Sequence, residues 1–210
     1  MAPRVCPWWI GYLLVSPLRR LLQNPDTILA GFVSPGMTVL EVGPAMGFFS
    51  LPLARLVGPA GRIVCVDVQE RMLQTLVKRA RLAGQADRIV ARVCGPTSLG
   101  LDDFTEGIDF ALAFAVVHEM PDPPRFFAEL ARLLRAGARC LVAEPKGHVT
   151  APAFEATLAT ARQVGLGLVG RPVIWRCRAA VLQKGEAADR RAAPGSYSAF
   201  KPAEFPRPLV

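Results

Sequence analysis

The segment from residue 39 to residue 67 constrains the fold of this chain most strongly. It begins with an apolar run that contains Glu41, passes through a glycine-rich turn into an Ala- and Leu-rich stretch, and ends with a second apolar run that closes on Asp67. Short apolar runs that alternate with amphipathic segments are typical of buried parallel strands connected by helices. We therefore expect a strand, a tight turn, a helix and a second strand, with a helix N-terminus and a carboxylate beside one crevice.

The same alternation continues along most of the chain. Apolar runs predict strands over residues 37–42, 62–66, 89–93, 109–115, 139–143, 166–173 and 174–183, and helices are predicted over 17–23, 25–32, 48–57, 69–83, 121–134 and 152–165. The last two strands follow each other without a helix, and strands joined directly pair antiparallel. The predicted fold is α/β, with a doubly wound, seven-stranded, mostly parallel sheet and a C-terminal antiparallel hairpin.

The turn and its two acids resemble a known family. Glu41 precedes the segment Gly43-Pro44-Ala45-Met46-Gly47, and Asp67 follows Gly47 by 20 residues. This arrangement resembles the acid-x-Gly-x-Gly-x-Gly motif of class I S-adenosylmethionine (SAM)-dependent methyltransferases. Ala45 stands in place of the middle glycine. The later segment Phe114-Ala115-Val116-Val117-His118-Glu119-Met120 resembles the Val-Leu-His-His type segment of the ubiquinone/menaquinone-biosynthesis-like and related small-molecule enzymes. The resemblance covers about residues 37–183 and implies a Rossmann-like fold with SAM as the cofactor.

The resemblance also implies roles for individual residues. Glu41 would accept hydrogen bonds from the amino group of the methionyl part, and Asp67 would accept both ribose hydroxyls. Val68 would lie along the adenine ring, with Gln69 near its edge. The other implied cofactor-binding residues are Gly43, Ala45, Gly47, Cys94, Gly95 and Ala115.

Gly95 marks a departure from the family pattern. The family often has an Asp at this position, which accepts the adenine amino group, whereas the chain has Gly95. Adenine recognition is therefore expected from backbone groups of this loop, or from the hydroxyl of Thr97 or Ser98.

A nicotinamide cofactor is the main alternative for this crevice. A dinucleotide fingerprint needs Gly-x-Gly-x-x-Gly, whereas the matching positions here are Gly43, Ala45 and Phe48. The Phe48 side chain would obstruct tight helix–strand packing and the approach of a pyrophosphate. The pattern favours SAM; a strand-turn-helix unit that binds no ligand is a further alternative.

The two histidines of the chain are the candidate catalytic residues. Methyl transfer requires the acceptor to be aligned and, in some cases, a proton to be removed. His118 and His148 each follow a predicted strand, and either could act as a general base near neutral pH. The alternative for His118 is a structural role between strand and helix. Glu119 and Glu144, in the same two loops, are candidate acceptor-binding residues, and no metal site is predicted.

The chain is predicted to have three parts. Residues 1–35 form a helical lid segment, in which Trp8, Trp9 and Tyr12 would cover the acceptor pocket; ordinary packing of these rings against the sheet is the alternative. Residues 36–184 form the SAM-binding domain. Residues 185–210, rich in Gly, Pro, Ala and charges, are expected to be a flexible tail.

Composition narrows the class of protein. The 210 residues are 51% hydrophobic, yet no apolar run approaches the ~20 residues of a membrane span, so a cytoplasmic protein is expected. The five widely spaced cysteines include no Cys-x-x-Cys pair and indicate neither a zinc site nor a disulfide framework. The net charge of +8 comes from basic residues that are scattered rather than packed into one run, which argues against a nucleic-acid partner.

These observations together predict an enzyme. We expect a SAM-dependent methyltransferase that transfers a methyl group to an oxygen, sulfur or carbon nucleophile of a small molecule. The alternatives are an RNA methyltransferase and a catalytically inactive SAM-binding interaction module.

Overall fold

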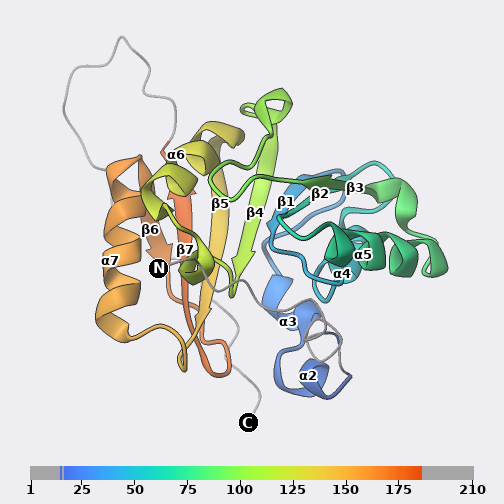
Figure 1. Ribbon diagram of the computed structural model, residues 1–210, viewed down its shortest axis with the longest axis horizontal. Helices are drawn as coiled ribbons and strands as arrows, with labels where there is room; N and C mark the ends of the chain where they lie inside the picture. The colour runs from blue at the N-terminus through green and yellow to red at the C-terminus, as the bar shows by residue number, and fades with distance from the viewer. Residues whose placement is uncertain (1–14, 16, 186–210) are drawn as a thin grey trace.

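Seven strands form one sheet in the part of the chain that the computed structural model describes, residue 15 and residues 17–185 (Figure 1). Their order across the sheet is β3-β2-β1-β4-β5-β7-β6, and β7 runs antiparallel to both of its neighbours while the other pairs are parallel. The predicted α/β sheet with a C-terminal antiparallel hairpin is confirmed. The strands are β1 (Thr38–Val42), β2 (Arg62–Asp67), β3 (Ile89–Val93), β4 (Ile108–Phe114), β5 (Leu134–Pro145), β6 (Leu166–Gly170) and β7 (Cys177–Lys184).

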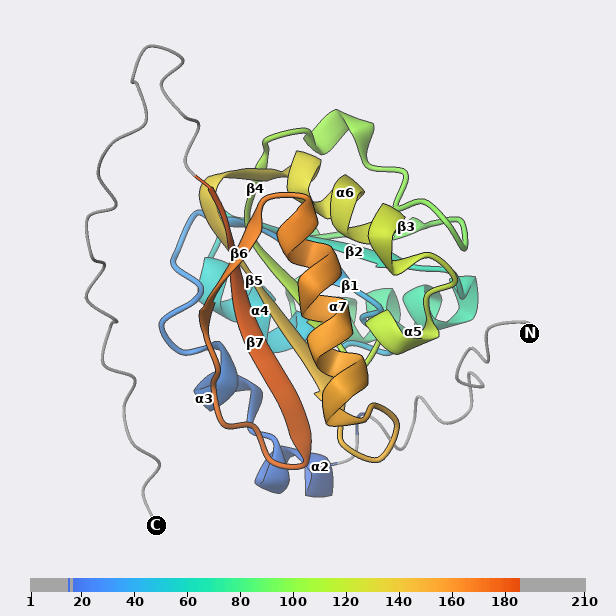
Figure 2. The same cartoon turned by 90° about the vertical axis from the view of Figure 1, so that its left-hand side faces the viewer.

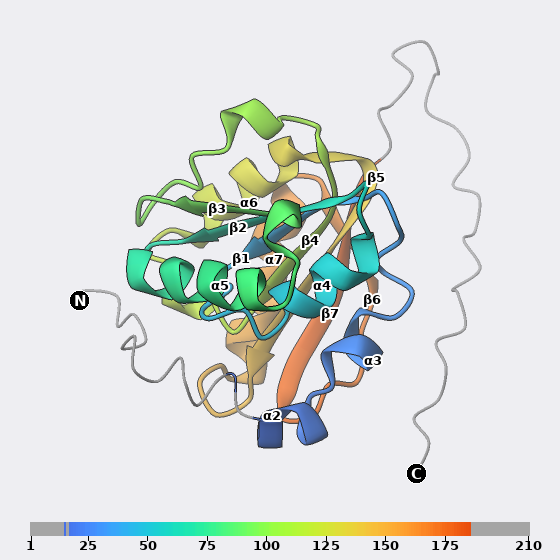
Figure 3. The same cartoon turned by 90° about the vertical axis from the view of Figure 1, so that its right-hand side faces the viewer.

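Helices cover both faces of the sheet. Figure 2 shows α6 and α7 in front of the sheet, and Figure 3, from the opposite side, shows α4 and α5 in front of it. The helices are α2 (Pro17–Leu22), α3 (Pro25–Leu29), α4 (Ser50–Val57), α5 (Glu70–Leu82), α6 (Pro123–Leu133) and α7 (Ala151–Gln163), with short 3₁₀ turns η2 (Ala86–Arg88), η3 (Asp102–Phe104) and η4 (Val117–Glu119). No helix in these described ranges is long and apolar enough to cross a membrane.

Each central strand contributes side chains to two separate cores. In β4, Phe110 and Leu112 pack with the α4 side, whereas Ala111 and Ala113 pack with the α6 and α7 side, and all four are at most 1% exposed. Burial on both faces explains why the strands read as nearly continuous apolar runs rather than as alternating patterns.

Side-chain caps determine where several helices begin. Asn24 accepts the backbone N–H of Asp26 at 3.0 Å and caps the start of α3. Asp122 accepts the N–H of Arg125 at 3.0 Å at the start of α6, which also has proline in its first turn. Such caps satisfy N–H groups that lack partners within the helix, and each stabilises the helix by about 1 kcal/mol.

Three predicted strand boundaries were wrong by three residues or more. β5 begins at Leu134, directly after α6, rather than at residue 139, because Leu134 already pairs with Ile108 and a register shift absorbs the extra residues. β6 ends at Gly170 rather than at residue 173, and β7 begins at Cys177 rather than at residue 174. Residues 171–176 form the connection to β7, where Pro172 has no N–H to donate to a ladder and Arg176 has a positive φ of 56°.

The strand order positions one crevice. β1 pairs with β2 on one side and with β4 on the other, so the order in which strands are added to the sheet reverses between β1 and β4. In open α/β sheets, ligands bind at this kind of switch point, outside the carboxyl ends of the strands. The predicted lid residues Trp8, Trp9 and Tyr12, and the tail from residue 186 onward, lie outside the described residues.

Candidate active site

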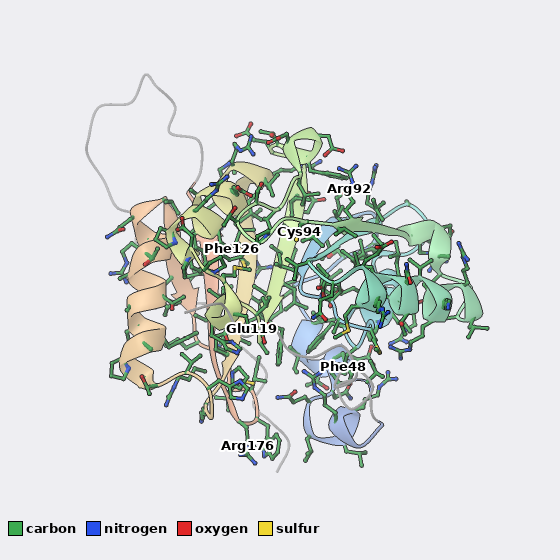
Figure 4. All side chains as sticks on the ribbon, viewed as in Figure 1. Phe48, Arg92, Cys94, Glu119, Phe126 and Arg176 are labelled. Carbon is green, nitrogen blue, oxygen red and sulfur yellow. The ribbon has the colours of Figure 1, made fainter. Side chains whose placement is uncertain are left out.

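A cavity of about 410 Å³ lies at the carboxyl ends of β1, β2 and β4. This volume is typical of a small-molecule or cofactor site. Figure 4 labels four residues that line it from different segments, namely Phe48, Cys94, Glu119 and Phe126. The predicted cofactor residues that line it are Glu41, Gly43, Ala45, Asp67, Val68, Gln69, Cys94, Gly95 and Ala115, and the predicted acceptor residue Glu119 lines it too.

The turn after β1 needs residues with little or no side chain. Gly43 has a φ of +67°, and a Cβ built on it would lie 2.7 Å from Cγ2 of Val116. Gly47 has a φ of +89°, and its Cβ would lie 2.4 Å from Cδ1 of Leu76. Gly47 therefore allows the turn to pack against α5, and the cavity lining among the described residues does not include it. Ala45 adopts a left-handed φ of 49°, a conformation in which its Cβ is strained.

Glu41 is a buried carboxyl group in the cavity wall. It is 3% exposed, and its Oε2 accepts the hydroxyl of Ser50, the first residue of α4, at 2.5 Å. Burial raises the pKa of Glu41 to about 7, and the Ser50 hydrogen bond opposes that rise. Sequence reasoning missed Ser50, although a hydroxyl at a helix start near an acid is a recognisable signal.

Asp67 ends β2 and borders the same cavity. Its Oδ1 accepts the backbone N–H of Gln69 at 2.9 Å, which holds the carboxylate in place at the strand end. Burial raises the pKa of Asp67, and backbone N–H groups of Gln69, Ala45 and Val68 act in the opposite direction. The carboxylate is therefore positioned by backbone donors from two turns.

Arg19 of α2 brings a cation to this cavity. Its guanidinium lies 4.2 Å from the centroid of the Phe48 ring, within cation–π range. Burial lowers the pKa of Arg19. Phe48, which was expected to obstruct a pyrophosphate, thus forms the platform for this guanidinium. No motif in the sequence identified Arg19, because α2 is separate from the glycine-rich turn.

The predicted catalytic histidines lie together beside Glu144. Nδ1 of His118 contacts Oε2 of Glu144, and Nε2 of His118 lies 3.3 Å from Nδ1 of His148. Glu144 is 1% exposed, its Oε1 accepts the N–H of Val117 at 2.8 Å, and the hydrogen bond to its carboxylate raises the pKa of His118. Among the described residues, the lining of the large cavity includes none of Glu144, His118 and His148. The array borders the cavity through Val116 and Glu119, which do line it.

Metal-binding geometry is missing from this part of the molecule. No group of three or more His, Cys, Asp or Glu residues within the described ranges is arranged to hold a metal ion. Cys65 and Cys140 are fully buried in the two cores, as expected for small apolar side chains.

The strand order and the turn define a class of protein, the doubly wound α/β domains with an acid-Gly-rich turn and a second acid after β2. A family model described as a methyltransferase domain matches residues 33–175, which is more than half of the chain. The chain belongs to this methyltransferase-domain family.

Comparisons with individual proteins agree with this membership. The chain is 35% identical over 123 residues to the nocamycin O-methyltransferase of Saccharothrix syringae, an alignment that covers 58% of the chain and 40% of that protein. It is 29% identical over 119 residues to the ubiquinone/menaquinone biosynthesis C-methyltransferase UbiE of Bordetella parapertussis, covering 56% and 44%. The alignments thus span less than half the length of these curated relatives.

A solved structure shows the same fold over nearly its whole length. The chain superposes on a SAM-dependent methyltransferase from Aquifex aeolicus with a TM-score of 0.76, 24% identity, and coverage of 85% of this chain and 99% of that one. This likeness confirms the architecture predicted from the sequence.

Proposed function

We propose that this protein is a SAM-dependent methyltransferase that acts on a small-molecule acceptor. The observation that supports it most directly is one cavity bordered by the glycine turn, by the carboxyl groups of Glu41 and Asp67, and by the guanidinium of Arg19. SAM carries an amino group and a carboxylate on its methionyl part and a diol on its ribose. The polar groups of the cavity complement each of these.

Each polar group has a partner in the proposed complex. Asp67 accepts the ribose hydroxyls, and Arg19 pairs with the methionyl carboxylate. Glu41 accepts a hydrogen bond from the methionyl amino group, and the backbone at Gly43 and Ala45 allows the ligand to approach closely. The apolar Val68 and Met72, both in the cavity lining, lie against the adenine ring in this arrangement.

SAM supplies an activated methyl group, so the protein must align the acceptor and remove its proton. Glu144 only accepts, which places a proton on Nδ1 of His118 and leaves Nε2 of His118 as the acceptor for Nδ1–H of His148. Nε2 of the exposed His148 then takes the proton from a hydroxyl or thiol acceptor. The proton on Nδ1 of His148 passes to Nε2 of His118. His118 becomes an imidazolium, which the carboxylate of Glu144 stabilises.

The relatives support a small acceptor. The names of the nocamycin O-methyltransferase and the ubiquinone/menaquinone C-methyltransferase both indicate small organic acceptors. An RNA acceptor is the competing proposal, since the net charge is +8. A binding module without activity is the other alternative.

Cofactor binding tests the first part of the proposal. Calorimetric titration of the full chain with SAM should show binding, and Asp67→Ala should weaken it at least about tenfold, because two charge-assisted hydrogen bonds are lost. Asp87→Ala is the matched control, since Asp87 is 71% exposed and should leave the affinity unchanged. Equal affinity in the wild type and Asp67→Ala would contradict the assigned ribose contact.

Acceptor turnover tests the second part. Release of S-adenosylhomocysteine is measured with a panel of phenols, quinols and thiols, and in parallel with transfer RNA. Release only with small acceptors supports the proposal, and release only with RNA supports the RNA methyltransferase. SAM binding without any release would identify an inactive module.

A further inference from the structure

Glu129 of α6 reaches the cavity wall next to the loop that follows β3. Its Oε2 accepts the backbone N–H of Leu99 at 2.7 Å and the hydroxyl of Ser98 at 3.3 Å. The loop is also closed on itself by a bridge between Gly95 and Ser98. Both the loop and Glu129 line the cavity, so a side chain from a distant helix completes this part of the wall.

The loop itself provides no acidic side chain. Residues 94–98 are Cys94-Gly95-Pro96-Thr97-Ser98. Burial raises the pKa of Cys94 to about 11, and the carboxylates of Asp67 and Glu129 both add to this rise. The Cys94 thiol therefore lies within electrostatic reach of two carboxylates, one that ends β2 and one that extends from α6. Together with Asp67, Glu129 is thus one of the two acids that lie near Cys94 in the cavity wall.

The Glu129 carboxylate retains capacity to accept another hydrogen bond. Oε2 is occupied by the two donors of the loop, whereas Oε1 has a long contact of 3.5 Å with Nε of Arg125. The side chain is 17% exposed, which leaves it partly shielded from water. A carboxylate oxygen has two lone-pair directions, so Oε1 can accept a donor from a ligand in the cavity.

We propose that Glu129 determines specificity for the purine of the cofactor by accepting the exocyclic amino group of adenine. This inference rests on the proposed function. The Leu99 and Ser98 hydrogen bonds hold the carboxylate against the loop, so that the wall presents a carboxylate acceptor where residues 94–98 have no acidic side chain. A base with a carbonyl in place of the amino group faces this carboxylate with acceptor against acceptor. Such a mismatch in a partly buried site is rejected strongly.

The test compares two ligands that differ at this one group. Calorimetry measures the affinities of S-adenosylhomocysteine and S-inosylhomocysteine for the full-length wild type and for Glu129→Gln. The wild type should prefer the adenine compound by at least about tenfold, and the preference should fall at least about tenfold in Glu129→Gln, because an amide can donate to the hypoxanthine carbonyl. A glutamine can still accept the Leu99 N–H, which preserves the loop.

Two further variants separate specificity from loop structure. Ser98→Ala removes one loop hydrogen bond and should keep the preference for the adenine compound. Glu155→Gln removes an exposed carboxylate on α7 and should leave both affinities unchanged. An unchanged preference in folded Glu129→Gln, or an equal loss of preference in Ser98→Ala, would overturn the role of Glu129. Failure of the wild type to bind either compound would instead overturn the proposed function itself.

Discussion

The carboxylate of Glu144 joins two strand ends: Oε1 accepts the N–H of Val117 at 2.8 Å, and Oε2 contacts Nδ1 of His118. Glu144 lies near the end of β5, whereas Val117 and His118 begin η4, the 3₁₀ turn that follows β4. One buried side chain therefore holds together the two loops that flank the proposed acceptor site. Because a buried carboxylate needs compensating partners, the backbone donor and the imidazole stabilise it together.

Glu144→Gln should lower the pKa of His118. The variant keeps an acceptor for the Val117 N–H but removes the negative charge that favours the imidazolium. The chain has two histidines, so NMR titration of their Cε1 protons follows both, and His148→Gln provides the assignment. A His118 signal that titrates at the same pH with and without the Glu144 carboxylate would refute the ion pair.

The same pair makes stability depend on pH in a defined direction. The pKa of His118 is raised in the folded protein. The contribution of the pair to the free energy of unfolding is therefore fully present below the unfolded histidine pKa of about 6.5, and it is lost as the pH rises through the folded pKa. In urea unfolding, Glu144→Gln should therefore lose more stability at pH 5.5 than at pH 9. An equal loss at both pH values would show that the effect comes from packing alone.

Glu41→Gln should stabilise the ligand-free protein at alkaline pH. The folded pKa of about 7 exceeds the ordinary value of 4.5, so the folded state binds more protons between these values and wild-type stability falls as the pH rises. Glutamine can still accept the Ser50 hydroxyl without becoming charged. The gain at pH 8 should be up to about 3 kcal/mol and should vanish near pH 4.5.

The measurement for Glu41 is chemical unfolding between pH 4.5 and pH 8. Asp87→Asn, at an exposed position, is the control and should leave the pH dependence of the wild type unchanged. If SAM binding uses the Glu41 carboxylate, the stabilised variant should also bind SAM more weakly. A variant with the same pH dependence as the wild type would show that Glu41 is not responsible for it.

Ala45→Gly should increase stability by about 0.5–1 kcal/mol. The left-handed φ of 49° strains an alanine by about 1–2 kcal/mol, and glycine relieves this strain while losing about 0.5–1 kcal/mol in backbone entropy. Ala131→Gly, within α6, should instead destabilise by about 1 kcal/mol. Thermal unfolding distinguishes the two signs, and a destabilised Ala45→Gly would mean that the turn is not strained.

Gly47→Ala should destabilise the protein by about 2–3 kcal/mol. The new Cβ would lie 2.4 Å from Cδ1 of Leu76, and φ is +89°, so steric overlap adds to backbone strain. Gly84→Ala is the matched control, because Gly84 also has a positive φ but nothing lies within 4 Å of its Cβ position. The control should lose only about 1 kcal/mol.

A second substitution checks the cause of the Gly47 effect. In the background Leu76→Ala, which removes the overlapping atom, Gly47→Ala should lose less stability than it does in the wild type. Equal losses at Gly47 and Gly84, or an unchanged loss in the Leu76→Ala background, would show that strain at φ is the whole effect.

Local sequence patterns were sufficient to predict the sheet, its C-terminal hairpin, and the two acids and the glycine turn that border the cavity. Glu41, Gly43 and Asp67 belong to one continuous strand-turn-helix-strand unit, so their spacing along the chain places them at one crevice whatever surrounds it. Strand limits were less accessible. Leu134 becomes part of β5 because Ile108 of β4 offers a pairing partner, which the local pattern around residue 134 does not indicate.

The pairings that complete the site were decided by the tertiary structure. Glu144 is 26 residues from His118, Glu129 is 30 residues from Leu99, and Arg19 reaches Phe48 from a separate helix. Parallel strands joined by helical crossovers bring such residues to one sheet edge, but which side chains meet there depends on loop paths and helix positions. The sequence by itself therefore determined the fold and the crevice for the cofactor. Only long-range packing decided that Glu144 contacts His118 and that Glu129 contacts the loop after β3.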